Sequence, residues 1–408
     1  MKKSVNKVMK YSMMISLIIT AYWLLMWGRA SDAVISFLQN VQKNASQQMT
    51  GTSTEYRYEQ EFQKTIRKYN QFGTTYQEKN STAIPGLIAT DVLGNVCEQM
   101  VPQGICIAGD YMIVSAYDNI AAYAGEKKQK NYEVNNSVLY ILSNQDPSNR
   151  KLLTTMVLPD INHVGGVAFD GARVWIAKST TKQCSTIDYN EIKTAANSGA
   201  DSYWLSEYTD NVKCGAVASF LTYYNDKLWV GTYSNLISGM GTLRSYDITN
   251  EESLQLVKQE EIQIPGYANG VAFMENGTDT YMAVSTSKGR YYDSNIYFYQ
   301  VEKDMISGNS IYYCYNSCKF PPMAEELICD GENTYFLFES SATCYSTQTY
   351  QKCAYPVDRI CALSTEHLFR SKAQPVYQAD IENLKSISGI LGNPVLYREE
   401  KYYWLNCA

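Results

Sequence analysis

The segment Gly165-Gly-Val-Ala-Phe-Asp-Gly-Ala-Arg-Val-Trp-Ile-Ala177 reads as two short strands joined by a tight turn. Apolar and aromatic residues fill both halves, and Asp170-Gly171 supplies the turn between them. The second half carries an aromatic residue near its centre. The same unit recurs four more times, at residues 103–115, 219–231, 269–285 and 325–337.

The starts of these five units are spaced 50 to 62 residues apart. A period near 50 residues with several strands per unit is typical of a β-propeller. We therefore predict an all-β fold, a five-bladed β-propeller over residues 86–370. A β-sandwich would explain the strands but not the repeated unit. The strand that closes the ring comes either from Leu87–Val92 or from the C-terminal tail, and the pattern leaves both open.

The first thirty residues predict a membrane segment. Four lysines precede an uncharged apolar run from Tyr11 to Trp27, which suits a start that stays in the cytoplasm. As a helix the run spans about 25 Å, slightly short of a bilayer core, yet it exceeds the usual apolar core of a cleaved signal. Residues 1–30 are thus a signal-anchor or a signal peptide, with the anchor favoured. The rest is expected outside the cytoplasm, anchored or secreted.

Residues 31–85 are expected to form a helical stalk and linker. Apolar residues recur at helical spacing in two groups, and Thr52-Ser-Thr-Glu55 has the spacing of a capping box that would start the second helix. The sequence leaves open whether these two predicted helices pack on each other, on the propeller or on a partner. The tail, residues 371–408, is expected to pack on the propeller. The first group of apolar residues at helical spacing is Val34, Phe37, Leu38 and Val41, and the second is Tyr58, Phe62, Ile66 and Tyr69.

Eleven cysteines follow the apolar run and none precedes it. In an oxidising compartment disulfides are the expected state. Cys184 with Cys214, and Cys344 with Cys353, flank short segments that a disulfide would staple. Cys314-x-x-x-Cys318 lacks the second ligand pair of a zinc site. The odd number leaves at least one thiol free or paired between chains, and the spacing does not fix the connectivity.

Composition excludes several classes of function. The 408 residues are 45% hydrophobic with a net charge of −6, which indicates a packed globular protein and argues against nucleic-acid binding. Only His163 and His367 occur, so a multi-histidine metal site within one chain is excluded. Neither a nucleophile elbow nor a P-loop is present.

A binding site is expected at one end of the propeller axis. The start of each inner strand and the end of the next strand share one face, where loops from every blade converge. Most of the starts are polar although the strands behind them are apolar. Alternatively, this polar ring is hydrated and only ties the blades together. The candidate ligand-binding residues are Gln103, His163, Lys178, Ser219, Asn269, Arg290, Glu325 and Glu339.

Three of these residues are candidates for catalysis. Glu325 and Glu339 lie on adjacent strands, where two carboxyl groups would divide acid and base roles if their pKa values differed. His163 is a candidate base, although a hydrogen bond to a neighbouring loop is the commoner role. Asn269 and Glu325 are candidate ligands for a divalent cation such as Ca²⁺, which takes oxygen ligands. Lys178 and Arg290 would bind an anionic group.

The repeat units resemble secreted bacterial β-propeller proteins without an established activity, and are loosely similar to NHL- and lactonase-type propellers. The resemblance covers roughly residues 86–365. Lactonase-like members imply a pore metal bound by carboxylates and asparagine; this chain has Asn269 and Glu325 at matching places but no second pore acid. The matching segments are Pro102-Gln-Gly104, His163-Val-Gly-Gly166, Ser219-Phe-Leu221, Asn269-Gly270, Ser285 to Arg290, Pro321-Pro-Met-Ala-Glu325 and Leu337-Phe-Glu-Ser340.

Two functions follow as hypotheses. The first is a propeller tethered to the membrane that binds a protein, a glycan or a small molecule at its pore face without catalysis. Its motivation is a repeated scaffold with a polar ring but no complete catalytic set. The second is a metal-assisted hydrolase or lyase, lactonase- or glycosidase-like, that uses Glu325, Glu339, Asn269 and His163.

Overall fold

The computed structural model describes residues 51–119, 134–179, 181–235, 240–250, 253–303, 310–347, 352–370, 395–398 and 401–404. The predicted membrane segment, the first predicted helix and most of the tail lie outside these ranges. No helix within the described ranges is long and apolar enough to cross a bilayer.

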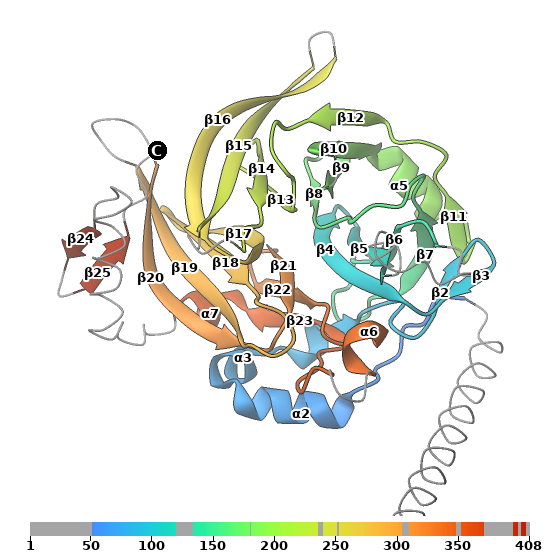
Figure 1. Cartoon of the computed structure of the whole chain (residues 1–408), viewed down its shortest axis with the longest axis horizontal. Coiled ribbons are helices and arrows are strands. Elements are labelled where there is room, and N and C mark those ends of the chain that lie inside the picture. Colours follow the sequence, from blue (N-terminus) through green and yellow to red (C-terminus); the bar gives the residue numbers. More distant parts are fainter. Residues whose placement is uncertain are drawn as a thin grey trace, which may run out of the picture. The chain divides into compact units, whose positions relative to one another are not determined.

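Five mainly antiparallel sheets surround one axis, which confirms the predicted five-bladed propeller (Figure 1). From the axis outward, blade 1 consists of β4 (Met100–Ala108), β5 (Tyr111–Asp118), β6 (Val138–Ser143) and β7 (Leu152–Val157), with β11 (Ser202–Trp204) added in parallel to β7 at the outer edge. Blade 2 consists of β8 (Val167–Phe169), β9 (Arg173–Lys178), β10 (Gln183–Asp188) and β12 (Asp210–Lys213). Blade 3 consists of β13 (Phe220–Tyr224), β14 (Lys227–Thr232), β15 (Met240–Asn250) and β16 (Leu254–Pro265).

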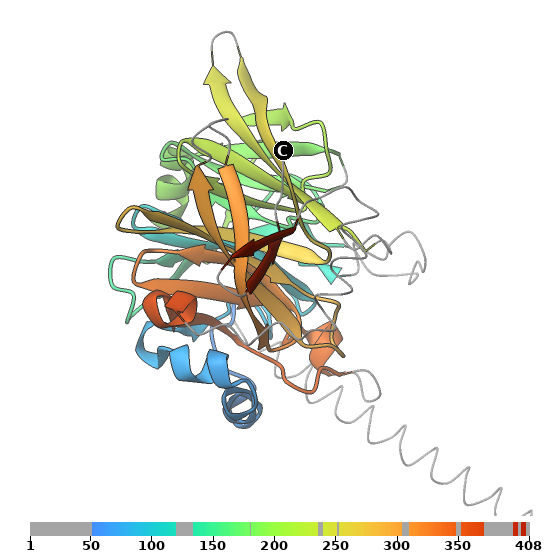
Figure 2. The same cartoon turned by 90° about the vertical axis from the view of Figure 1, so that its left-hand side faces the viewer.

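Blade 4 consists of β17 (Ala268–Asn276), β18 (Asp279–Thr286), β19 (Ser294–Lys303) and β20 (Ser310–Phe320). Blade 5 consists of β21 (Ala324–Cys329), β22 (Asn333–Phe338), β23 (Arg359–Ser364) and β1 (Thr82–Ala83). In the side view the long β15–β16 hairpin extends beyond its neighbours (Figure 2, yellow). A separate hairpin pairs β24 (Val395–Arg398) with β25 (Lys401–Trp404).

The repeated unit of the sequence forms the two inner strands of every blade. Between these strands the chain turns through at least one residue with positive φ, which glycine and asparagine tolerate best. The residues concerned are Gly109, Gly171, Asn225, Asp226, Gly277 and Gly331. The turn residues noted in the sequence therefore have a direct conformational role.

The strand that closes the ring differs from both expected segments. β1 pairs with β23, with Thr82 opposite Ile360 and Ala83 opposite Arg359. The segment expected to close the ring instead contributes β2 (Thr90–Val92), which forms a hairpin with β3 (Asn95–Cys97). The last blade is thus completed by a strand from the N-terminal side of the propeller.

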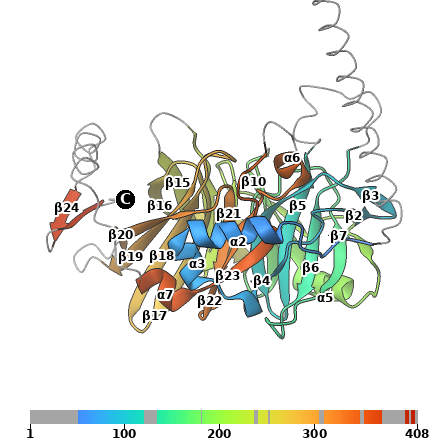
Figure 3. The ribbon, with the colours of Figure 1, turned by 90° about the horizontal axis from the view of Figure 1, so that it is seen from below.

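The helices before the first blade pack on the propeller. α2 (Glu59–Lys68) and α3 (Asn70–Thr75) lie along the outside of blades 4 and 5 (Figure 3). Phe62 and Phe72 are fully buried against Phe320, Phe338 and other apolar residues. Packing on the main domain was one of the arrangements that the sequence left open. The 3-10 helix η1 (Glu78–Asn80) leads from α3 to β1.

The capping-box prediction at Thr52 was wrong. α2 begins at Glu59 and no side chain caps its first turn. The Thr52 hydroxyl instead hydrogen-bonds the Thr155 hydroxyl at 2.7 Å. The Ser53 hydroxyl accepts the backbone N–H groups of Ile88 and Ala89 at 3.1 and 3.2 Å. These hydroxyl groups hold the incoming chain against the propeller, so they are not available for a helix.

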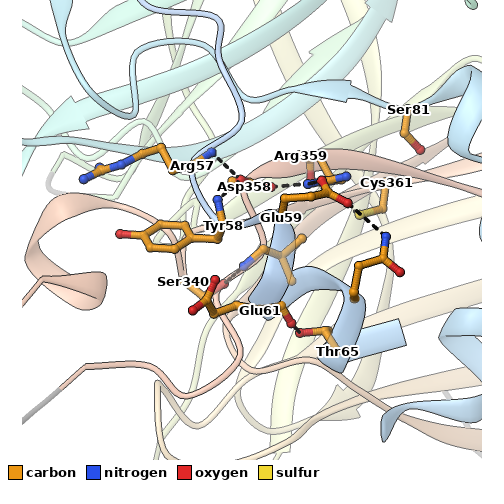
Figure 4. A network of polar contacts seen from close by, with 12 residues as sticks. Arg57, Tyr58, Glu59, Glu61, Thr65, Ser81, Ser340, Asp358, Arg359 and Cys361 are labelled. Carbon is orange, nitrogen blue, oxygen red and sulfur yellow. Dashed lines mark hydrogen bonds and ion pairs between the residues drawn. The ribbon is translucent and has the colours of Figure 1, made fainter. Parts of the chain in front are cut away.

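A buried network fixes the N-terminal segment to blade 5 (Figure 4). Asp358 Oδ2 accepts the backbone N–H groups of Arg57 and Tyr58 at 2.6 and 2.7 Å, and Asp358 Oδ1 accepts from Arg359 Nε at 3.0 Å. The same guanidinium donates to Glu59 at 2.8 Å and lies 3.8 Å from the centre of the Phe62 ring. The buried charges of Asp358 and Arg359 therefore form an ion pair with each other.

Candidate functional site

A cavity of about 470 Å³ opens at one end of the propeller axis. Its lining includes Gln103, His163, Ser219, Asn269, Glu325 and Glu339, all of which the sequence named as ligand-binding candidates. Lys178 and Arg290, the other two candidates, are not among the lining residues. The cavity is also lined by Tyr117, Gly165, Ser179, Tyr233, Ser287, Lys288, Gly289 and Tyr345. We call it the pore pocket.

Irregular strand pairing explains why these side chains converge. The register between the two inner strands shifts between Pro102 and Ile105 in blade 1, and between Ala324 and Leu327 in blade 5. A similar shift follows Ala268 in blade 4. Such a bulge redirects side chains at the end of a strand. The first residue of the repeat is thereby placed at the mouth of the axis.

The second residue of the blade 5 repeat contacts the inner strands of three other blades. This residue is Glu326, whose Oε2 accepts from Ile105 N at 2.7 Å and from Val167 N at 3.0 Å. Its Oε1 accepts from Leu221 N at 3.1 Å. One carboxylate from blade 5 therefore binds the inner strands of blades 1, 2 and 3. Burial raises the pKa of Glu326, and the three N–H groups oppose that shift.

Glycine at the equivalent positions makes room for Glu326. A Cβ atom on Gly166 would lie 2.7 Å from Glu326 Oε1, and one on Gly270 would lie 2.6 Å from Glu326 Cα. Below this level a second cavity of about 340 Å³ is lined by Ile105, Val167, Leu327 and neighbouring residues.

Two carboxyl groups lie together in the pore pocket. Glu325 begins the blade 5 repeat, Glu339 follows β22, and their side chains are hydrogen-bonded to each other. Asn269 Nδ2 donates to Glu325 Oε1 at 3.0 Å, and Gln103 Nε2 donates to Glu339 Oε2 at 3.1 Å. Two carboxyl groups hydrogen-bond to each other only when they share a proton.

The environment favours this shared proton at neutral pH. Burial, followed by the charge of Glu339, raises the pKa of Glu325 well above 4.5. Burial also raises the pKa of Glu339, to about 7, although hydrogen bonds from Gln103 and Glu325 and the charge of Arg290 oppose the shift. The Glu325–Glu339 pair is therefore poised between a neutral and a singly charged state near pH 7.

Aromatic side chains and one histidine form the walls around this pair. Tyr345, on the short helix α6 (Thr343–Ser346), hydrogen-bonds both Glu339 and Tyr117. The Tyr117 ring lies 4.7 Å from the His163 ring, centre to centre. His163 Nδ1 is buried and has no hydrogen-bond partner in the described part of the protein. Burial lowers the pKa of His163, so the ring is neutral at pH 7.

The basic candidates occupy different positions. Arg290 lies 4.8 Å from the centre of the Tyr345 ring and acts on Glu339 through its charge. Lys288 lines the pocket and lies 5.1 Å from the Tyr267 ring. Lys178 is ion-paired with Asp160 and is buried in blade 2. Lys178 is thus engaged by the segment that joins blade 1 to blade 2.

The metal candidates do not form a ligand set in this geometry. The amide nitrogen of Asn269 points to Glu325, so the two candidate ligands bond to each other. Within the described ranges, no group of three or more His, Cys, Asp or Glu side chains is placed to hold a metal ion.

Sequence reasoning missed two features of the site. It did not identify Tyr345, because a short helix after a strand leaves no periodic signal. It also gave Glu326 no role. A signal was available, since Glu326 occupies the repeat position at which blades 1, 2 and 4 have Gly104, Gly166 and Gly270.

Comparison with known proteins adds no sequence family: no family model and no curated protein matches the chain. Similar solved structures include a glutaminyl cyclase of Myxococcus xanthus, with 12% identity, a TM-score of 0.36, and 65% of this chain and 91% of that chain covered. Another is the GH43_1 enzyme of Xanthomonas citri complexed with xylose, with 7% identity, a TM-score of 0.38, and coverage of 74% and 92%.

A third is a putative 6-phosphogluconolactonase of Bacteroides uniformis, with 12% identity, a TM-score of 0.33, and coverage of 58% and 78%. At these identities and TM-scores, the matches do not bear on ligand or activity. The fold and the site together define a five-bladed β-propeller with an acidic pocket at one end of its axis.

Proposed function

We propose that this protein is an extracytoplasmic propeller, anchored or secreted through residues 1–30, that binds a small ligand carrying an ammonium group in the pore pocket. The observation that carries this proposal is the hydrogen-bonded Glu325–Glu339 pair in a cavity of about 470 Å³. Binding, without chemical conversion of the ligand, is the function that we assign to this pocket.

An ammonium group is a suitable replacement for the shared proton. It supplies one positive charge and several N–H donors, so both carboxyl groups become acceptors when it binds. Tyr117, Tyr233 and Tyr345 line the same cavity, and aromatic rings attract cations through their faces. Ligand binding then releases the shared proton to solvent.

The basic residues near the mouth favour a ligand with an acidic group at its other end. Lys288 lines the cavity and Arg290 lies beside Tyr345. A purely cationic ligand would be repelled by these charges, whereas a zwitterion would pair with both sides. Amino acids and the amino termini of short peptides have this arrangement of charge.

The arrangement of the carboxyl groups argues against a glycosidase. Enzymes that cleave glycosidic bonds with two carboxyl groups hold them about 5 Å or more apart. Glu325 and Glu339 are in direct hydrogen-bonding contact. A carbohydrate substrate or a water molecule would have to separate them before either could act in this way.

Matched ligands test the proposal directly. Isothermal titration calorimetry would compare glycylglycine and glycine with their N-acetylated forms, which lack the positive charge. We expect only the amines to bind, with release of protons that is measured by repeating the titration in two buffers of different ionisation enthalpy. Equal binding of the acetylated forms, or no binding of either amine, would contradict the proposal.

Two variants locate the binding. Glu339→Gln removes the acid but keeps an amide of the same shape, and we expect at least a tenfold loss of amine affinity, the effect of roughly one charged hydrogen bond. Glu332→Gln is the matched control, because Glu332 is exposed on the same blade and we expect wild-type affinity.

The second candidate is a hydrolase or lyase. It is favoured by the shared proton, since one carboxyl group could activate water while the other donates a proton. The metal assistance expected from the sequence has no ligand set among the described residues. Mass spectrometry of each ligand after incubation separates the two functions: a product that forms with the wild type but not with Glu339→Gln would establish catalysis and overturn the binding function.

A further inference from the structure

Cys184 and Cys214 meet at the outer part of blade 2. Cys184 lies on β10 opposite Val212, and Cys214 follows the end of β12. Their thiol groups are hydrogen-bonded to each other.

The surroundings hold both sulfur atoms in place. Cys184 is fully buried and Cys214 is 3% exposed, within the apolar cluster between blades 2 and 3. The Tyr246 hydroxyl of blade 3 donates to the backbone oxygen of Cys214 at 2.6 Å. In the folded protein the hydrogen bond from Cys184 lowers the pKa of Cys214.

The chain between the two cysteines makes an excursion to the neighbouring blade. After β10 it forms α5 (Tyr189–Ala196) and then β11 (Ser202–Trp204), which pairs in parallel with β7 of blade 1. It then returns to blade 2 as β12. Cys184 and Cys214 therefore mark the two ends of a segment that joins blades 1 and 2.

We propose that Cys184 and Cys214 form a disulfide that closes this excursion and that it forms by exchange with an external disulfide. The Cys214 thiolate attacks the external disulfide, forms a mixed disulfide and releases one thiol. The Cys184 thiolate then attacks the Cys214 sulfur and releases the second thiol. The protein loses two electrons and two protons, and the external disulfide gains them.

The burial of both sulfur atoms sets the time at which this exchange takes place. A large external disulfide cannot reach them in the folded propeller, so the bond forms while the excursion is still open during folding. The disulfide closes a loop of about 30 residues. It stabilises the folded protein because it limits the conformations open to the unfolded chain. Once formed, the bond is protected from reductants by the same packing.

Mass spectrometry gives the decisive test. The full chain would be refolded with oxidised and reduced glutathione, alkylated in denaturant without reductant, and digested. We expect a cross-linked peptide that joins Cys184 to Cys214. Alkylation of both residues, or a cross-link from either one to another cysteine such as Cys407, would overturn the proposal.

Thermal unfolding tests the energetic role. We expect the melting temperature of the oxidised chain to exceed that of the reduced chain by about 5 °C, the range for a loop of this length. Cys184→Ser with Cys214→Ser should abolish the difference, and Cys344→Ser with Cys353→Ser should retain it. Should the first double variant fail to fold, the comparison of oxidised and reduced wild type remains decisive, because equal melting temperatures contradict the stabilising role.

Discussion

Blade 5 contains two buried acidic sites that differ in how their charge is compensated. Asp358 accepts two backbone N–H groups and the Arg359 guanidinium, so both of its oxygens have donors. Glu325 and Glu339 face each other, and the groups that donate to them are neutral: the amides of Asn269 and Gln103 and the side chain of Tyr345. The first arrangement holds the N-terminal segment in place. The second disfavours ionisation, as expected of a site built for a ligand.

Glu326 shows that position in the sequence does not decide this difference. It follows Glu325 directly, yet its carboxyl group accepts three backbone N–H groups from three other blades. Consecutive residues of one bulge therefore have opposite roles. One carboxyl group joins the blades at the axis, and the other faces the pocket.

The largest effect on stability is expected at Asp358, whose charge is compensated by hydrogen-bond donors. Asp358→Ala leaves the Arg359 charge buried without its close partner and removes the acceptor of two backbone N–H groups. We expect a loss of about 3–5 kcal/mol in the free energy of unfolding, measured by urea denaturation. Glu59→Gln is the control, because the Glu59 side chain is 57% exposed and its ion pair contributes less than about 1 kcal/mol. Similar losses for both variants would contradict this assignment.

A smaller loss is expected at the axis. Glu326→Gln replaces one acceptor oxygen by an NH₂ group that faces backbone N–H donors. We expect the free energy of unfolding to fall by about 1–3 kcal/mol. Glu332→Gln, exposed on the same blade, should have no measurable effect in the same urea titration. An unchanged midpoint for Glu326→Gln would show that the carboxylate does not join the blades.

The smallest effect is expected from the Glu325–Glu339 pair. It concerns the slope of the free energy of unfolding against pH. Because both pKa values are raised in the folded state, the folded protein binds more protons than the unfolded chain. Their contribution to stability is complete below pH 4.5 and is lost as the pH rises towards and through about 7. Glu339→Gln should flatten the decline over this range, as followed by urea unfolding at a series of pH values. An unchanged slope would mean that the two groups titrate normally.

The fold was predictable because its determinant is local and repeated. Each inner hairpin combines apolar strands with a turn residue that tolerates positive φ, such as Gly171 or Asn225. The period then gives the number of blades. The pore positions follow from the same repeat, since the starts of the inner strands meet at one end of the axis.

The remaining features depend on contacts between distant segments. A closing strand of two residues, Thr82–Ala83, has no periodicity to detect. The hydroxyl groups of Thr52 and Ser53 match a helix cap in sequence, but they bond to the propeller instead. Lys178 follows a strand in the expected way, yet Asp160 competes for its charge.

The pairing of β1 with β23 has a consequence for biosynthesis. A strand made early must remain without its partner until the last blade has left the ribosome, because its hydrogen bonds are to residues near Ile360. The ring therefore cannot be completed blade by blade as the chain emerges. Final closure is a late event that depends on nearly the whole propeller, and an interrupted chain would expose an unpaired sheet edge to other proteins.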